Sequence, residues 1–214
     1  MSNTALGPRT PRRGGPFSRF AGRLLMRLMG WRIAGAFPDL EKFVTIGAPH
    51  SSNYDFFIAM GTILSTGVRI HILGKHTLFK GPLGPIMRWC DILPVDRRAA
   101  HGVVGESVAA LNAADRLVIG IAPEGTRNPK PGAGWKTGFW HIARQAGVPI
   151  IPVALDYTTR TVLIGDLVTP TNSMEADFAL LSAFYAGVQG ATRQLAATIP
   201  TGGTRPVEPK GTAG

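Results

Sequence analysis

The 214-residue sequence predicts a single α/β domain with a largely parallel central sheet flanked by helices. Three observations lead to this prediction. Short apolar runs typical of buried strands alternate along the chain with longer segments of helical periodicity. Hydrophobic residues make up 44% of the chain, which is enough to build a sizeable core. No internal repeat or change of composition divides the sequence into two parts.

The amino-terminal part of the chain is strongly basic. The net charge is +10, and seven arginines but no acidic residue precede Asp39. A concentration of basic residues indicates an anionic partner, either a membrane or a nucleic acid. Residues 1–16 are rich in Gly, Pro and Arg, so we expect them to be disordered.

Residues 17–34 show the spacing of an amphipathic helix. The apolar side consists of Phe17, Phe20, Leu24, Leu25, Leu28 and Trp31, and the basic side of Arg19, Arg23 and Arg27. Such a helix suits the surface of an anionic membrane, but it could also pack its apolar side on the core, and the two can be combined. Nucleic-acid binding is not expected, because no recognised binding module accompanies the basic residues.

The expected location follows from what interrupts the apolar segments. No apolar run reaches the ~18 residues needed to span a bilayer, and arginines break up the segment that a signal peptide would need. We therefore expect a peripheral (monotopic) protein on the cytoplasmic face of the cell membrane, with no transmembrane helix. The single cysteine, Cys90, excludes an intramolecular disulfide. No His/Cys cluster suggests a metal site.

The main domain is predicted over residues 35–199. Apolar runs rich in β-branched residues predict strands at 43–47, 68–73, 92–95, 117–121, 149–155 and 161–164. Helical spacing predicts helices at 54–64, 103–114, 136–146 and 174–199. A segment broken by Gly and Pro covers 81–88, and the Pro/Gly-rich residues 200–214 are expected to be disordered.

The segment Ala48–Phe57 carries the first candidate site. His50 lies in a predicted strand-to-helix loop, and Asp55 lies in the first turn of the following helix, for which Ser51 or Ser52 is the expected N-cap. A carboxylate beside an imidazole fixes its tautomer and stabilises the protonated ring, so the pair predicts a general base. Chance alone gives this spacing roughly once in five such sequences. A capping box from Ser52 to Asp55 is the structural alternative.

A second candidate site is Glu124-Gly125-Thr126-Arg127, which follows the predicted strand 117–121. Chance produces this tetrapeptide in well under about one sequence in a hundred. Gly125 allows a close approach of the backbone to a ligand, and Arg127 suits bidentate binding of phosphate. A salt bridge of Arg127 at a turn is the alternative. In a parallel sheet, ligands gather beyond the carboxyl ends of the strands, so this loop and the His50 loop can face the same crevice.

These motifs resemble those of the 1-acyl-glycerol-3-phosphate acyltransferase family, also called the glycerolipid acyltransferases. The resemblance covers roughly residues 42–155 and consists of four motifs in the family's order: 50–55 (HSSNYD); 80–82 (KGP) through 95–97 (VDR); 124–127 (EGTR); and 148–153 (VPIIPV). The chain has Pro49 where many members have Asn, and it is similar to a compact bacterial subgroup. Residues 35–199 are thereby identified as an acyltransferase domain.

The resemblance implies a reaction and a set of roles. His50, paired with Asp55, deprotonates the acceptor hydroxyl, which attacks the thioester of acyl-CoA or acyl carrier protein without an acyl-enzyme. The substrate-binding residues would be Glu124, Gly125, Thr126 and Arg127, joined by Arg97 and Lys136. Backbone amides near Ser51 are candidate donors to the oxyanion. No cofactor is implied, since the acyl donor is a substrate.

Three functions remain open at this point. The first is transfer of a fatty acyl group to a lysophosphatidate-like lipid in phospholipid biosynthesis. The second is the same chemistry on another acceptor, such as a glycolipid, an amino-acid lipid or another alcohol. The third is a non-catalytic protein that binds lipid at the membrane surface. The paired His50 and Asp55 argue against the third, because a binding protein needs no base.

Overall fold

A computed structural model describes residues 6–75, 84–89, 91–95, 102–125, 134–192 and 201–202. It confirms the predicted fold class: a seven-stranded, mostly parallel sheet with the strand order β1-β8-β7-β2-β5-β3-β4. Only the β7–β8 pair in this sheet is antiparallel among the described strand pairs. A separate pair of short strands joins β6 to β9.

The elements alternate as the sequence predicts. The strands are β1 (Arg32–Ala34), β2 (Lys42–Ala48), β3 (His71–Lys75), β4 (Ile92–Val95), β5 (Leu117–Ile121), β6 (Trp135–Lys136), β7 (Ile150–Asp156), β8 (Thr161–Ile164) and β9 (Thr201–Gly202). The helices are α1 (Pro16–Leu28), α2 (Tyr54–Thr66), α3 (Gly84–Trp89), α4 (Gly102–Ala113), α5 (Gly138–Ala146) and α6 (Met174–Tyr185).

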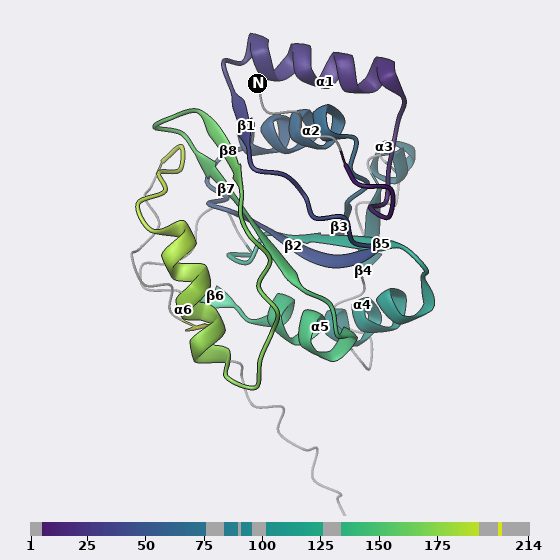
Figure 1. The fold of residues 1–214 in the computed structure, drawn as a ribbon, viewed down its shortest axis with the longest axis vertical. Helices are drawn as coiled ribbons and strands as arrows, with labels where there is room; N and C mark the ends of the chain where they lie inside the picture. Colours follow the sequence, from purple (N-terminus) through teal and green to yellow (C-terminus); the bar gives the residue numbers. More distant parts are fainter. Residues whose placement is uncertain are drawn as a thin grey trace, which may run out of the picture.

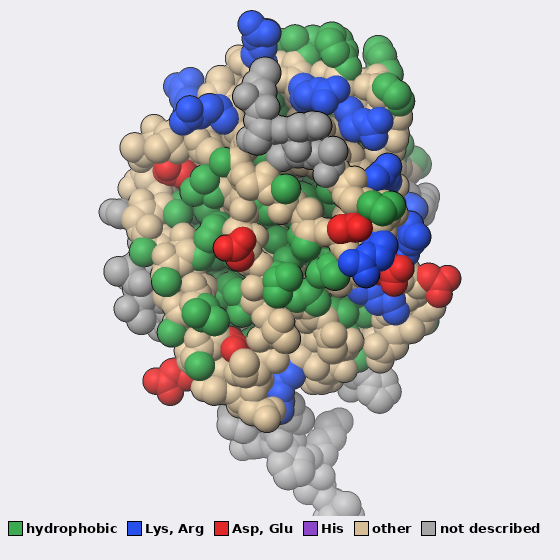
Figure 2. All heavy atoms as spheres, in the orientation of Figure 1, with side chains coloured by type: hydrophobic (Ala, Val, Ile, Leu, Met, Phe, Trp, Pro, Cys, Tyr) green, Lys and Arg blue, Asp and Glu red, His purple; other side chains and the backbone are tan. Residues whose placement is uncertain are grey.

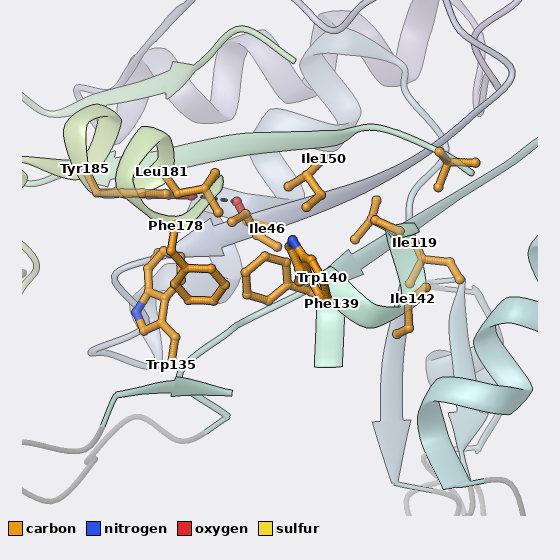
Figure 3. Packing of buried hydrophobic residues seen from close by; sticks show 14 of the residues in the cluster. Ile46, Ile119, Trp135, Phe139, Trp140, Ile142, Ile150, Phe178, Leu181 and Tyr185 are labelled. Atoms are coloured by element: carbon orange, nitrogen blue, oxygen red, sulfur yellow. Dashed lines mark hydrogen bonds between the residues drawn. The ribbon is translucent and has the colours of Figure 1, made fainter. Parts of the chain in front are cut away.

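Helices cover both faces of the sheet, as Figure 1 shows, with α1 and α2 on one side and α4, α5 and α6 on the other. Successive side chains of a strand point to opposite faces. In β2, Val44 and Ile46 pack with α5 and α6, whereas Phe43 packs with α2. Figure 3 shows the first of these two cores, in which aromatic rings of α5 and α6 surround Ile46.

Helix α1 packs closely on α2 through small residues. A Cβ added at Gly22 of α1 would lie 2.4 Å from the backbone nitrogen of Ser65, and one added at Gly61 of α2 would lie 2.6 Å from the sulfur of Met26. Met26 is accordingly buried. None of the described helices is long and apolar enough to cross a membrane.

The predicted helix over 17–34 is too long. Helix α1 ends at Leu28, Gly30 takes a left-handed φ of 73°, and the chain continues as β1, which pairs with β8. The predicted apolar side is also divided, because Phe17, Phe20, Leu24 and Leu28 are exposed while Trp31 lies in the core. The helix therefore contacts α2 through Gly22 and Met26, and only Leu25 of the predicted helical face, which is half-buried, lies against Gly61 as well.

Other boundaries differ for similar local reasons. Helix α6 ends at Tyr185, before Gly187 with its φ of 78°, and not at 199. Lys136 belongs to β6, so α5 begins two residues later than predicted. Strand β3 begins at 71 instead of 68, and the segment broken by Gly and Pro contains the short helix α3.

The expectation of disorder is wrong for the described part of the amino-terminal segment, residues 6–16. Thr10 is completely buried, and its hydroxyl donates to the carbonyl of Pro38. Arg13 forms an ion pair with Asp91 at 3.1 Å. Of the predicted carboxyl-terminal tail, residues 200 and 203–214 lie outside the described residues, while 201–202 pair with β6.

Candidate active site

Three adjacent strands bring the candidate residues together. In the sheet, β2 lies between β7 and β5, with Ile46 aligned with Ile121 of β5 and with Pro152 of β7. Because the three strands are parallel, their carboxyl ends meet at one edge. His50 follows β2, Glu124 follows β5, and the segment after β7 reaches the same place.

His50 and Asp55 form the predicted pair. Nδ1 of His50 lies 3.3 Å from Oδ2 of Asp55, and the carboxylate is buried while about a third of the imidazole is exposed. The loop folds back because Asp55 stands at the second position of α2, which begins at Tyr54. The pair therefore has a fixed inner member and an imidazole that reaches the surface of the site.

Hydrogen bonds from the loop itself hold Asp55. Its Oδ2 accepts from the backbone amides of Ser51 at 2.7 Å and Ser52 at 2.8 Å. Burial alone would raise the pKa of Asp55, but hydrogen bonds from His50, Tyr157, Ser52 and Ser51 outweigh it and lower the pKa below its ordinary value. Asp55 is thus held as an anion beside the imidazole.

The capping interpretation of this stretch holds in part. The N-cap of α2 is Asn53 and makes no side-chain cap hydrogen bond, whereas the hydroxyl of Ser52 accepts from the amide of Tyr54 at 3.0 Å. Asp55 does bond the amide of Ser52, as the carboxylate of a capping box does. One carboxylate therefore serves both the helix start and the imidazole.

Tyr157 is a site residue that the sequence analysis missed. It follows β7 directly, and its hydroxyl donates to Oδ1 of Asp55 at 2.5 Å. Burial and the Asp55 carboxylate raise the pKa of the phenol far above its ordinary value, so it remains a donor. The sequence offered only its place shortly after the predicted strand 149–155, because the pairing of that strand with β2 is known from the structure alone.

Glu124 connects the two predicted motifs. It is buried, and its Oε2 accepts from the backbone amide of His50 at 3.2 Å. Gly125 follows in a left-handed conformation with a φ of 68°. The end of the Lys136 side chain lies against Gly125, since a Cβ there would come within 2.7 Å of the Lys136 Nζ. The predicted residues Glu124, Gly125 and Lys136 thus lie together beside His50.

The other predicted site residues, Thr126, Arg127 and Arg97, lie outside the described residues. Within the described ranges, no three His, Cys, Asp or Glu side chains are grouped so as to hold a metal ion. The hydroxyl of Ser51 accepts from the amide of Ala191 at 2.9 Å, so it is engaged in packing the segment after α6.

An apolar cavity of about 550 Å³ adjoins the pair. It lies between α2 and the sheet, and His50 and Asp55 form part of its wall. The rest of the wall is mainly aliphatic and aromatic, and includes Phe37, Ile63, Ile70, Ile72, Gly120, Ile121, Val153, Leu155, Phe56 and Ala59. Such a volume, with few polar groups at one end, suits an apolar ligand with a polar head.

Comparison with known proteins bears on the family and the fold. The family profile described as Acyltransferase matches residues 35–156. The 1-acyl-sn-glycerol-3-phosphate acyltransferase of Escherichia coli is 33% identical over 168 residues, which cover 75% of this chain and 66% of the relative. The enzyme of the same name from Haemophilus influenzae is 32% identical over 159 residues, 70% of this chain and 64% of the relative. The chain therefore spans slightly less than two thirds of the length of these relatives.

A solved structure shares the fold. The crystal structure of the 1-acyl-sn-glycerophosphate (LPA) acyltransferase PlsC from Thermotoga maritima superimposes with a TM-score of 0.57 at 20% identity, over 80% of this chain and 77% of that one. The profile match covers more than half of the chain and contains both predicted motifs, 50–55 and 124–127. On this evidence the chain belongs to the acyltransferase family.

Proposed function

We propose that the protein transfers a fatty acyl group from an acyl thioester to the hydroxyl of a lysophosphatidate-like lipid. One observation carries the proposal: an imidazole held by a buried carboxylate lies in the wall of an apolar cavity. The relatives from E. coli and H. influenzae, named for this reaction on 1-acyl-sn-glycerol-3-phosphate, support the choice of acceptor. Acyl-CoA or acyl carrier protein would supply the acyl group.

In the proposed mechanism His50 is a general base. Its Nδ1 faces Asp55, so Nε2 takes the proton of the acceptor hydroxyl as the oxygen attacks the thioester carbonyl. The Asp55 carboxylate stabilises the imidazolium that forms. The tetrahedral intermediate then expels the thiolate, which takes the proton from Nε2, and an ester and a free thiol result. No acyl-enzyme is needed.

Two of the candidate oxyanion donors near Ser51 have another acceptor. The amides of Ser51 and Ser52 already donate to Asp55, at 2.7 and 2.8 Å. Their place in the mechanism is to keep the carboxylate ionised and oriented.

The acceptor phosphate is assigned to the loop after β5. Lys136 lies against Gly125, and a cation there supports binding of an anionic head group next to His50. By the family resemblance, Arg127 and Thr126 belong to the same phosphate site, and Arg97 contributes a further cation. Glu124 joins this loop to the backbone of His50, so the phosphate site and the base keep a fixed position relative to each other.

The apolar cavity is proposed to hold the acyl chain of the donor. The donor chain begins at the reacting carbonyl carbon, and His50 lies in the cavity wall, so a chain entering there starts at the site of the chemistry. The acyl chain of the acceptor begins several bonds from the reacting hydroxyl and fits this position less directly. Varying the two chains separately distinguishes them.

Replacing Ala59 with leucine is expected to shorten the preferred donor chain. Ala59 lines the cavity from α2, and the larger side chain would occupy space that methylenes of the donor need. Each excluded methylene costs about 0.8 kcal/mol of binding, or roughly fourfold in kcat/KM. The measurement is kcat/KM over a series of saturated donors. Ala179→Leu, on the exposed side of α6, is the matched control, and an unchanged series in Ala59→Leu would exclude the cavity as the donor site.

A peripheral position on an anionic membrane is proposed from the surface of α1. Phe17, Phe20, Leu24 and Leu28 are 83, 59, 44 and 77% exposed, although they form one apolar stripe. Arg23 and Arg27, on the same helix, are also exposed. Figure 2 shows hydrophobic and basic side chains next to one another along the top of the molecule, where α1 lies. A stripe of this kind suits a bilayer interface.

Substituting serine for Phe17, Phe20 and Leu28 together is expected to weaken binding to vesicles containing anionic lipid by about 100-fold, because apolar contact area is lost. The side chains are exposed, so the fold should be kept. Sedimentation with vesicles measures the effect. Serine at the exposed Leu167 and Leu180 gives the control. Equal partitioning of the α1 variant and wild type would contradict the proposal. Deleting residues 1–34 is a poorer test, because it also removes β1 and the buried Trp31.

The acceptor is tested by offering lysophosphatidate beside non-phosphorylated lipid alcohols and identifying the product by mass spectrometry. Acylation of lysophosphatidate alone supports the proposed function. Acylation of a neutral alcohol alone would keep the mechanism and replace the acceptor.

A further inference from the structure

The two oxygens of the Asp55 carboxylate have different partners. Oδ2 accepts from the amides of Ser51 and Ser52 and faces the His50 imidazole. Oδ1 accepts from the Tyr157 hydroxyl, at 2.5 Å. Three donors thus meet one oxygen, while the Tyr157 phenol donates to the other. A donor on the second oxygen adds a further restraint on rotation about the Cβ–Cγ bond, from a side of the group that the Ser51–Ser52 loop does not reach.

Tyr157 is itself held by contacts of its backbone and of its ring. Its backbone amide donates to the carbonyl of Gln189 at 2.8 Å. Its ring meets Trp31 edge-on, with the ring centroids 4.9 Å apart and the planes at 84°. Trp31 is buried between the end of α1 and the start of β1. The phenol is therefore positioned by the rigid body of the domain and not by the loop that carries His50.

The charged and titratable groups around the pair are few. Asp55 faces His50 and Tyr157, and the backbone amide of His50 meets Glu124 from the loop after β5. Tyr54, at the start of α2, lies near the Tyr157 phenol. Among these groups, Tyr157 is a neutral donor that reaches the carboxylate from a separate strand end.

We propose that Tyr157 is a positioning residue for the general base, fixing the Asp55 carboxylate in the plane that lets Oδ2 hold the His50 imidazole. The phenol also withdraws charge from the carboxylate, because a hydrogen-bonded oxygen carries less negative charge toward its other partners. Tyr157 thus sets the orientation of the His50 imidazole. It also sets how strongly the Asp55 carboxylate stabilises the protonated imidazole. Its role in turnover rests on the proposed function.

Replacing Tyr157 with phenylalanine keeps the ring against Trp31 and removes only the hydroxyl. We expect kcat to fall about tenfold, since a hydrogen bond to a charged group is lost, with little change in donor KM. The acidic limb of the kcat/KM profile should move to higher pH, because the carboxylate, now less neutralised, stabilises the imidazolium more strongly. A wild-type kcat and an unmoved limb would overturn the proposal, whatever happens to stability.

Tyr185→Phe is the matched control. The Tyr185 hydroxyl donates to the carbonyl of Ile46 at 2.9 Å and accepts from the amide of Val153 at 3.1 Å, so this variant also removes a buried, hydrogen-bonded tyrosine hydroxyl. This variant should lose stability while its acidic limb stays in place. An equal shift of the acidic limb of the kcat/KM profile in both variants would contradict the proposal, because it would show that Tyr157 acts only through packing.

A second measurement needs no turnover. The carboxyl carbon of Asp55, followed by NMR as the pH is lowered, should titrate at higher pH in Tyr157→Phe than in wild type. In a protein with 3-fluorotyrosine at position 157, whose phenol is a stronger donor, it should titrate at lower pH. If Asp55 titrates at the same pH in both altered proteins as in wild type, the inference is contradicted. If the titration moves as expected but no acyl transfer is found, the proposed function fails while the hydrogen bond's control of Asp55 stands.

Discussion

Replacing His50 with alanine is expected to lower kcat by about 10²–10⁴-fold, the range that a general base contributes. The imidazole is the group that takes the proton of the acceptor hydroxyl, and no second described histidine lies beside a carboxylate in the cavity wall. Donor KM should change little, because the base acts in the chemical step. Acyl transfer at saturating donor and acceptor is the measurement.

The fold of the His50→Ala variant should persist, because about a third of the imidazole is exposed and Asp55 keeps its bonds from Ser51, Ser52 and Tyr157. Thermal unfolding checks this point. His71→Ala is the control: His71 begins β3, at the opposite end of the strand from the site, and is also largely buried. A folded His50→Ala variant with wild-type kcat would sink the mechanism.

Replacing Asp55 with asparagine is expected to lower both activity and stability. The amide group cannot accept from all of the donors around it, so buried donors at Ser51, Ser52 or Tyr157 lose a partner, at about 1–3 kcal/mol for each unsatisfied group. The imidazole also loses the anion that orients it, and loss of such a carboxylate costs up to about 10⁴-fold in kcat in comparable His–Asp systems.

The stability effect should depend on pH in a defined direction. The pKa of Asp55 lies below the ordinary value of 3.8, because hydrogen bonds from His50 and other donors outweigh burial. The stability that the ionised form contributes is therefore fully present above that value and is lost as the pH falls through the lower pKa of the folded state. Urea unfolding of wild type and Asp55→Asn at pH 7 and at pH values below 3.8 measures the difference. A difference that grows as the pH falls would contradict this account of the Asp55 contacts.

The His50–Asp55 pair could be predicted because both residues belong to one short loop. The short loop between a strand and the start of the next helix restricts where these two side chains can lie. The same reasoning placed Glu124 at the carboxyl end of a neighbouring strand. Tyr157 could not be predicted in this way. It lies 102 residues from Asp55 in the sequence, and the contact depends on β7 pairing with β2, which no local pattern fixes.

The amino-terminal helix shows a different limit of sequence reasoning. Periodicity identified its apolar stripe but not which side would meet the domain. Close packing on α2 uses Gly22, whose missing side chain allows the approach and which carries no hydrophobic signal. The stripe of Phe17, Phe20, Leu24 and Leu28 was left outward as a consequence. Similarly, α1 and α6 end shortly before glycines in the left-handed conformation, whereas helical spacing alone predicted longer helices.

The most direct test of direct acyl transfer is the release of free thiol from acyl-CoA and from acyl carrier protein, in rapid-mixing experiments with lysophosphatidate supplied or withheld. The account predicts that thiol release requires the acceptor and disappears in His50→Ala. It also predicts no initial burst of thiol when the acceptor is absent. A stoichiometric burst without acceptor would reveal an acyl-enzyme and contradict the proposed mechanism. Absence of release with either donor and lysophosphatidate would contradict the proposed function.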